Sequence, residues 1–394
     1  MRTISKIFII IFLNAGTVLS SDEVRVSNPQ INFLKYYREA HYNLKLIDLE
    51  SQLNEKLELV QQPERRAMKA LISYSKFAMN FGRNIDEKYY KEFLEDVNEA
   101  IESLEALSSQ KPNNISLKLN LGLLYGLKGG VALGYQKDYF DAYIFGVKGV
   151  QLLDDVYKNN TQLIDIELSK GILKLMIAQS TWYVRWLAPL IVESGSISEG
   201  INHLDKVVEK GEYVSDEASL AHVLLLWGDI EKNYLRKSLS RLEKFTEQYP
   251  ENIQIYIALA RGFWLANEYE KSNFYALQGI IKIQRHNSVF MRKHGVTMQS
   301  FLLYWHYRYL AEKKEWLKLL RQTEQRSESP IQSTFKAVAL WNMGQYKSSK
   351  ELAEQTLGNL KETELEMPLF IVPFLFDLKP TLQSIVEDKI LGQD

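Results

Sequence analysis

The chain has 394 residues, of which 25% are charged, and its 48 lysines and arginines nearly balance its 49 aspartates and glutamates. The near-zero net charge argues against a protein that coats nucleic acid, and an aromatic content of 12% argues against a disordered chain. The absence of cysteine excludes disulfides, thiolate metal sites and cysteine nucleophiles. The composition therefore excludes several kinds of catalytic and metal site, and it does not identify a ligand.

The first twenty residues have the order of a secretory signal. Arg2 and Lys6 precede the apolar run IFIIIFL at 7–13, and small residues lead to a cleavage site after Ser20. The run is shorter than the ~20 residues that span a bilayer. We therefore expect residues 1–20 to be removed and the mature protein to be periplasmic or secreted. The alternative is a buried N-terminal helix of a cytosolic protein.

No later stretch of sequence is predicted to span a membrane. The most apolar candidate, residues 367–376 (MPLFIVPFLF), is about half the length of a bilayer-spanning helix and is broken by Pro368 and Pro373. It is predicted to be a buried piece or a docking surface. We expect no stable membrane anchor after signal cleavage.

Spacings of small and large residues fit a 34-residue repeat in two places. With Ile115 as position 1, positions 7, 8 and 11 are Leu121, Gly122 and Tyr125. In the unit before it, positions 20, 24, 27 and 32 are Ala100, Leu104, Leu107 and Pro112. With Ile253 as position 1, positions 4, 7, 8, 11, 20, 24 and 27 are Tyr256, Leu259, Ala260, Phe263, Ser272, Ala276 and Gly279. The unit before it carries Ser238, Leu242, Phe245 and Pro250 at positions 20, 24, 27 and 32.

A third, looser match lies near the C-terminus. Positions 15, 17, 20, 24 and 27 are Gly344, Tyr346, Ser349, Ala353 and Thr356. Between Leu121 and Ala142 the spacing is too long by about eight residues for the 34-residue unit, which predicts an extended first helix or a longer turn.

These positions define the tetratricopeptide repeat, in which each unit is a pair of antiparallel helices. Small residues at positions 8, 20 and 27 let the helices approach, and a proline at position 32 ends the second helix. The predicted fold class is all-α, a right-handed α-solenoid of tetratricopeptide-like helical hairpins. After the signal we predict an N-terminal helical cap at 21–80, repeats with extended central helices at 81–285, and degenerate repeats with a cap at 286–394.

The middle of the chain, about 115–285, resembles a bacterial group of exported tetratricopeptide-like proteins that are distantly similar to the Iml2 and TTC39-type proteins. The matching residues are Ala142, Tyr143, Gly146, Gly149, Trp182, Tyr183, Trp186, Gly195, Gly211, Tyr213, Glu217 and Ala218. The tyrosine-rich segment expected near Gly171 is missing. The resemblance implies an architecture and no common reaction.

Motifs for catalysis or cofactor binding fail on spacing. The segment GSISEG at 195–200 lacks the spacing of a nucleophile elbow and is predicted to start a helix, with Ser196 or Ser198 as the cap. The glycines between 122 and 134 lack a phosphate-binding pattern and are predicted to let two helices pack closely. His286 and His294 would need a third ligand to bind a metal. We therefore predict no catalytic residue, no metal and no cofactor.

Two aromatic clusters are the candidate binding residues. The first contains Trp182, Tyr183, Arg185 and Trp186, and the second contains Tyr304, Trp305, Tyr307 and Arg308. A helix with rings on every side is either deeply packed or exposes anchors for a partner. Core packing is the alternative at both clusters.

Two classes of function fit these observations. The first and preferred class is a non-catalytic periplasmic scaffold that binds a protein or peptide in the cell envelope. The second is a small-ligand-binding or transporter-associated helical protein, similar in logic to the T component of tripartite carboxylate transporters. An enzyme is the third and weakest hypothesis.

Overall fold

The computed structural model is described for residues 36–37, 39–43, 45, 47–60, 62, 64–79, 87–136, 138–159, 164–179, 196–211, 214–225, 232–324, 329–363 and 372–387. Every regular element in these ranges is a helix, as the sequence predicts. The predicted signal at 1–20 and the first aromatic cluster, with Trp182, Tyr183, Arg185 and Trp186, lie outside the described residues.

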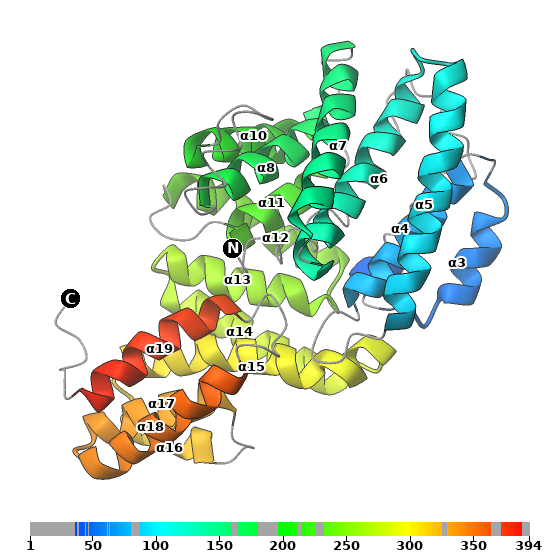
Figure 1. Cartoon of the computed structure of the whole chain (residues 1–394). Coiled ribbons are helices and arrows are strands. Elements are labelled where there is room, and N and C mark those ends of the chain that lie inside the picture. The colour runs from blue at the N-terminus through cyan, green and yellow to red at the C-terminus, as the bar shows by residue number, and fades with distance from the viewer. Residues whose placement is uncertain are drawn as a thin grey trace. The chain divides into compact units, whose positions relative to one another are not determined.

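The chain divides into two compact units, and the first comprises residues 1–252 with 288–290. Its helices, shown in blue to green in Figure 1, pack mainly on their neighbours in sequence. They are α3 (Glu50–Leu57), α4 (Glu64–Met79), α5 (Glu87–Gln110), α6 (Ile115–Val131), the π-helix η2 (Ala132–Gln136), α7 (Tyr139–Asn159), the 3₁₀-helix η3 (Ile164–Ile166), α8 (Glu167–Gln179), α10 (Ile197–Lys210), α11 (Ser215–Leu225) and α12 (Lys232–Gln248).

Helices α6 and α7 lie side by side because glycines remove the side chains between them (Figure 1). A β-carbon added at Gly149 would lie 2.9 Å from the carbonyl oxygen of Gly122 and 3.1 Å from the nitrogen of Gly126. One added at Gly129 would lie 3.1 Å from the nitrogen of Gly146. The two backbones are therefore in contact, which confirms the packing interpretation of these glycines.

The extra length between Leu121 and Ala142 is taken up by helix. Helix α6 continues without a break into η2 and ends at Gln136. Asp138 then accepts hydrogen bonds from the backbone N–H groups of Phe140 and Asp141 and starts α7. The first of the two predicted alternatives, an extended first helix, is thus the one observed.

A short N-terminal segment ties distant helices of the first unit together. Tyr37 is buried and its hydroxyl lies 2.5 Å from that of Ser75 on α4. Five residues later, Tyr42 donates a hydrogen bond to Glu217 on α11. The Tyr42 ring packs against Phe245 of α12 and Tyr249, which directly follows α12, with ring centroids 4.8 and 4.9 Å apart. This tyrosine segment, residues 37–42, therefore spans from α4 to α12.

The second unit comprises residues 253–287 and 291–394 and begins at Ile253, which is position 1 of the predicted repeat. Its helices, green to red in Figure 1, are α13 (Ile253–Leu265), α14 (Tyr269–Arg285), α15 (Val289–Glu312), α16 (Trp316–Glu324), α17 (Pro330–Asn342), α18 (Tyr346–Thr363) and α19 (Val372–Val386). The predicted region boundaries at 80 and 285 stay predictions, because compactness does not define where a repeat ends.

Three turns of the second unit have the same geometry. Asn267, Lys314 and Gly344 have φ angles of 62°, 56° and 79°, and each stands two residues before an aromatic residue that begins a helix. In each turn the following N–H bonds the carbonyl five residues back, as in Glu268 to Phe263, at 2.8–2.9 Å. This is the Schellman motif that closes helices with a left-handed residue.

Buried serine hydroxyls recur at the same position of the 34-residue repeat. Ser272 donates to the carbonyl of Ala260 at 2.6 Å, and Ser349 donates to that of Ala337 at 2.7 Å. Both serines occupy position 20 of the repeat and both carbonyls belong to position 8. The predicted hairpin pattern is therefore confirmed for α13–α14 and α17–α18. Helices α5 and α12 end two residues before Pro112 and Pro250, also as predicted.

Candidate functional site

The second aromatic cluster lies in the core of its unit. Tyr304, Trp305 and Tyr307 are 2%, 3% and 0% exposed. Their rings pack on Trp264 of α13 and Phe335 of α17, with centroids 5.7–5.9 Å apart. The core-packing alternative is the one that the structure shows for these three rings, and they present no surface to a partner.

Arg308 belongs to the same cluster and is half-buried. Its guanidinium lies 4.7 Å from the centre of the Trp264 ring and donates a hydrogen bond of 2.9 Å to the Tyr304 hydroxyl. A cation over an indole face is a favourable contact that helps to fix helix packing. Arg308 thus joins α13 to α15 within the second unit.

Among the described residues, no group of three histidine, aspartate or glutamate side chains is arranged to hold a metal ion. The described part of the glycine–serine segment GSISEG, residues 196–200, starts α10, and Ser196 caps the helix in a capping box with Glu199, which is the predicted structural role.

A serine, a histidine and an aspartate do come together at the junction of α10, α11 and α12. The Ser238 hydroxyl lies 2.7 Å from Nδ1 of His222, and Nε2 of His222 lies 3.5 Å from Asp205. Ser238 and His222 are fully buried. Burial lowers the pKa of His222 to about 4 and raises that of Asp205 to about 6. A substrate cannot reach this serine, so the three residues are a packing cluster.

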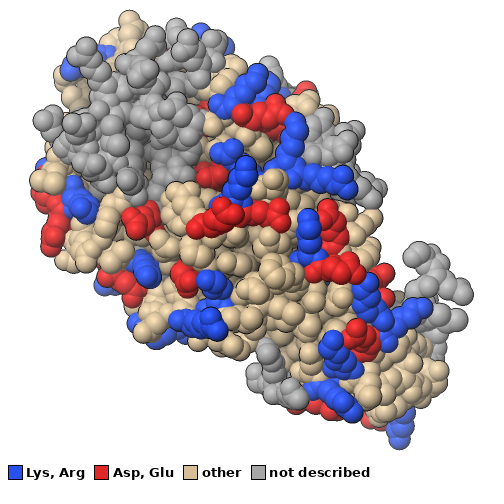
Figure 2. Space-filling view, turned by 180° about the vertical axis from the view of Figure 1, so that it is seen from behind, with Lys and Arg blue, Asp and Glu red and all other residues tan. Residues whose placement is uncertain are grey.

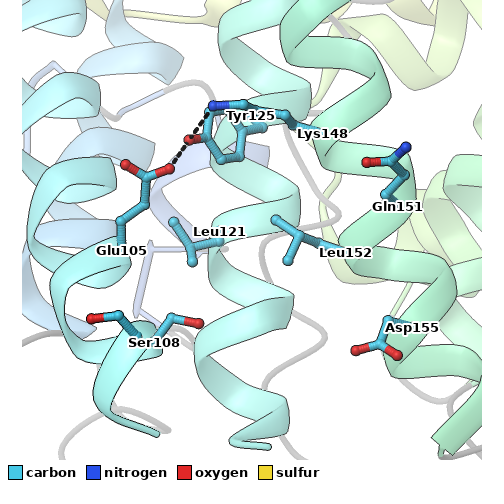
Figure 3. Close-up of a pocket in the computed structure, with 9 residues that line it drawn as sticks. Glu105, Ser108, Leu121, Tyr125, Lys148, Gln151, Leu152 and Asp155 are labelled. Atoms are coloured by element: carbon cyan, nitrogen blue, oxygen red, sulfur yellow. Dashed lines mark hydrogen bonds between the residues drawn. The ribbon is translucent and has the colours of Figure 1, made fainter. Parts of the chain in front are cut away.

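A groove crosses α5, α6 and α7 in the first unit and is the candidate site (Figure 3). Its volume is about 540 Å³, within the range of ligand-binding clefts. The floor contains Leu121 and Leu152, and most of the polar lining is exposed to solvent. The lining residues are Glu105, Ser108 and Ser109 of α5, Leu121 and Tyr125 of α6, and Lys148, Gln151, Leu152 and Asp155 of α7.

A chain of polar contacts crosses the groove. The Tyr125 hydroxyl donates to Glu105 of α5, and the Lys148 amine of α7 donates to the same hydroxyl at 3.4 Å (Figure 3). Burial, together with the hydrogen bond and the charge of Glu105, raises the pKa of Tyr125. Tyr125 therefore stays protonated and links Glu105 of α5 to Lys148 of α7.

Lysines and rings alternate across helices α6 and α7, from the groove residues Lys148 and Tyr125 to Phe145 and Lys128, which lie outside its lining. Lys148 lies 5.0 Å from the centre of the Tyr125 ring, and Lys128 lies 4.1 Å from that of Phe145. The two rings are stacked, with centroids 6.1 Å apart. Burial lowers the pKa of Lys128, and the positive charge of Lys148 lowers it further. Such ring-supported ammonium groups are held in place for contact with an acceptor.

The groove depends on the glycine contact described above. Because Gly149 lies against Gly122, the residues before and after Gly149 on α7 stand close to α6. In the sequence, Tyr125 belongs to the predicted repeat and Gly149 belongs to the residues that carry the family resemblance, and neither points to this groove. The available signal is that Tyr125 and Lys148 both lie on glycine-containing helices, and it can be interpreted only once α6 and α7 are known to be neighbours.

The described residues on the face shown in Figure 2 form no patch of a single charge sign. In Figure 2 lysines and arginines alternate with aspartates and glutamates over the face shown. Within the described residues, no helix has the length and apolarity needed to cross a bilayer.

The fold defines a helical-repeat protein, and its α5–α7 groove is open and lined largely by polar residues. No protein-family model matches the chain, and no curated protein is significantly similar to it. A search of solved structures finds similarity to yeast Tom70, with a TM-score of 0.38 and 10% identity, over 82% of this chain and 64% of that one. This chain thus spans less than two thirds of the length of the Tom70 chain. The tetratricopeptide character therefore rests on the repeated turns and buried serines of the second unit.

Proposed function

We propose that the protein is a non-catalytic, exported scaffold that binds an extended segment of another polypeptide in the α5–α7 groove. The observation that carries the proposal is the composition of the groove, in which an apolar floor lies between a wall with Glu105 and two serine hydroxyls and a wall with Lys148, Gln151 and Asp155. An extended peptide offers apolar side chains to such a floor and backbone donors and acceptors to such walls.

The openness of the groove favours a chain over an enclosed small ligand. Glu105, Ser109, Lys148 and Gln151 are exposed, so the walls do not close over the floor. Small-molecule sites bury most of the surface of their ligand, whereas a peptide can lie across three helices and leave the groove at both ends. A peptide partner in the cell envelope fits both this geometry and the predicted export signal.

The groove is tested by peptides selected for binding to the full chain from a library of short random sequences. Leu152→Asp places a charge on the floor and is expected to weaken the selected peptides by about 10-fold or more. Leu317→Asp is the matched control, because it makes the same change at an exposed leucine of α16. Equal affinity for both variants would show that the peptides bind elsewhere. Failure to select any peptide would contradict the proposal itself.

The export part of the proposal is tested separately. Deletion of residues 2–20 should move the protein from the envelope fraction to the cytosol of the expressing bacterium. Recovery of both forms in the cytosol would contradict the assignment of a secretory signal.

A further inference from the structure

Helix α14 of the second unit carries an exposed apolar stripe. Phe274, Leu277 and Ile281 are 54%, 38% and 38% exposed. They stand three and four residues apart, so they lie on one face of the helix across two turns. The other side of α14 packs on the neighbouring helices through small residues such as Gly279.

A comparison of equivalent positions in α14 and α18 shows that the repeat does not require apolar residues on this face. Ser272 and Ser349 occupy the same repeat position, so Phe274 and Leu277 of α14 correspond to Glu351 and Glu354 of α18. Both glutamates are exposed. The same face is thus a charged, solvated surface on one helix and an apolar surface on the other, which marks the α14 stripe as an interaction surface.

Opposite charges stand at the two ends of the stripe. Glu270 lies four residues before Phe274, and Arg285 lies four residues after Ile281. Glu270 also binds Lys313 at 2.6 Å, while its side chain stays 68% exposed. The sequence of the face is therefore acidic, then apolar, then basic along the helix.

This order is complementary to itself when a second α14 runs in the opposite direction. In that register Phe274 meets Ile281 of the second copy, and Glu270 meets Arg285 of the second copy at each end. Leu277 lies beside the twofold axis, next to its own equivalent. A twofold interface of this kind requires such a self-complementary surface.

We propose that the α14 stripe is the interface of a homodimer, in which two copies of the chain pack their α14 helices antiparallel. Two turns of one helix bury less area than the 1,200–2,000 Å² of a typical stable interface. The dimer is therefore weak and reversible, with a dissociation constant on the order of 10–100 µM.

Sedimentation equilibrium of the full chain across this concentration range is the test. The unchanged protein is expected to show a monomer–dimer equilibrium, and Phe274→Glu is expected to weaken it by about 100-fold. Arg285→Glu alone places two acidic residues together at each end and is expected to weaken the dimer by about 10-fold. The double variant Glu270→Arg/Arg285→Glu restores opposite charges and is expected to return to within about threefold of the unchanged protein.

The matched control is Glu351→Arg, which changes the equivalent charged face of α18 and should leave the equilibrium unchanged. Circular dichroism and thermal unfolding show whether each variant is folded. A protein that stays monomeric across the range would overturn the proposal and would mean that the stripe faces a different partner. A dimer that Phe274→Glu does not weaken, or that the double charge reversal does not restore, would also overturn it.

Discussion

In hairpins α6–α7 and α13–α14 the two helices pack closely, but different residues connect them and allow their approach. In α13–α14 a left-handed Asn267 closes a short turn, and a buried serine hydroxyl binds the facing backbone. In α6–α7 no such turn closes the hairpin, because α6 continues as a π-helix, and the two backbones meet at glycines. The short turn fixes a regular unit that sequence spacing can identify. The glycine contact brings α7 close to α6, where Lys148 of α7 reaches the Tyr125 hydroxyl of α6.

The largest expected effect tests the glycine contact. Gly149→Leu forces side-chain atoms into the backbone of α6, where an added β-carbon already lies 2.9 Å from the Gly122 carbonyl. We expect a loss of about 3–5 kcal/mol in the free energy of unfolding, measured in urea. Gly146→Ala is the control, because an added β-carbon meets nothing within 4 Å there. It should gain up to ~1 kcal/mol from helix propensity, and an equal loss in both variants would contradict close packing at Gly149.

The second-largest expected effect is a pH dependence of stability in the first unit. Ser238 occupies position 20 of the repeat there, and its hydroxyl contacts His222 instead of a backbone carbonyl. The folded pKa of His222 is lowered to about 4, so this group costs stability as the pH falls below its unfolded value of ~6.5. The folded pKa of Asp205 is raised to about 6, so this group gains stability as the pH falls through 6. Near pH 5 the two contributions oppose each other.

Asp205→Asn removes one of these contributions and leaves the other. Relative to the unchanged protein, the variant should lose about 2 kcal/mol of stability between pH 7 and pH 4. Urea unfolding at several pH values measures this difference. A difference that does not depend on pH would mean that the pKa of Asp205 is not raised in the folded state.

A smaller effect tests the buried hydroxyls of the second unit. Ser272→Ala removes a hydrogen bond of 2.6 Å and should cost about 1–2 kcal/mol in thermal or urea unfolding. Ser349→Ala removes the equivalent bond of 2.7 Å and should cost the same within about 0.5 kcal/mol. If only one of the two variants lost stability, the buried serines of the two hairpins would not be equivalent.

The smallest effect tests the turns. Lys314 has a φ of 56° and carries a side chain that disfavours this conformation. Lys314→Gly should therefore raise stability by about 0.5–1 kcal/mol, whereas Gly344→Ala, at a φ of 79°, should lower it by about 1 kcal/mol. Thermal unfolding of the two variants should shift the midpoint in opposite directions.

The sequence predicted those parts of the fold that depend on local spacing. The small residues Ser272, Ala276 and Gly279 are buried as expected, because each hairpin must bury the same face. The sequence alone does not predict whether Tyr304 and Trp305 are buried or exposed, since periodicity does not distinguish a helix packed on all sides from one that exposes its rings. The groove was missed because Glu105 and Lys148 stand 43 positions apart in the chain, and only helix packing brings both to Tyr125.

The tyrosine segment at 37–42 has a consequence for the order of folding. Tyr42 finds its partners Glu217, Phe245 and Tyr249 only after about two hundred further residues have been synthesised. Contacts between neighbouring helices can form early, whereas a contact of this sequence separation pays a large loop-closure entropy. We therefore expect Tyr37 to contact Ser75 of α4 before Tyr42 contacts α11 and α12, so that the N-terminal segment is anchored in two separate steps.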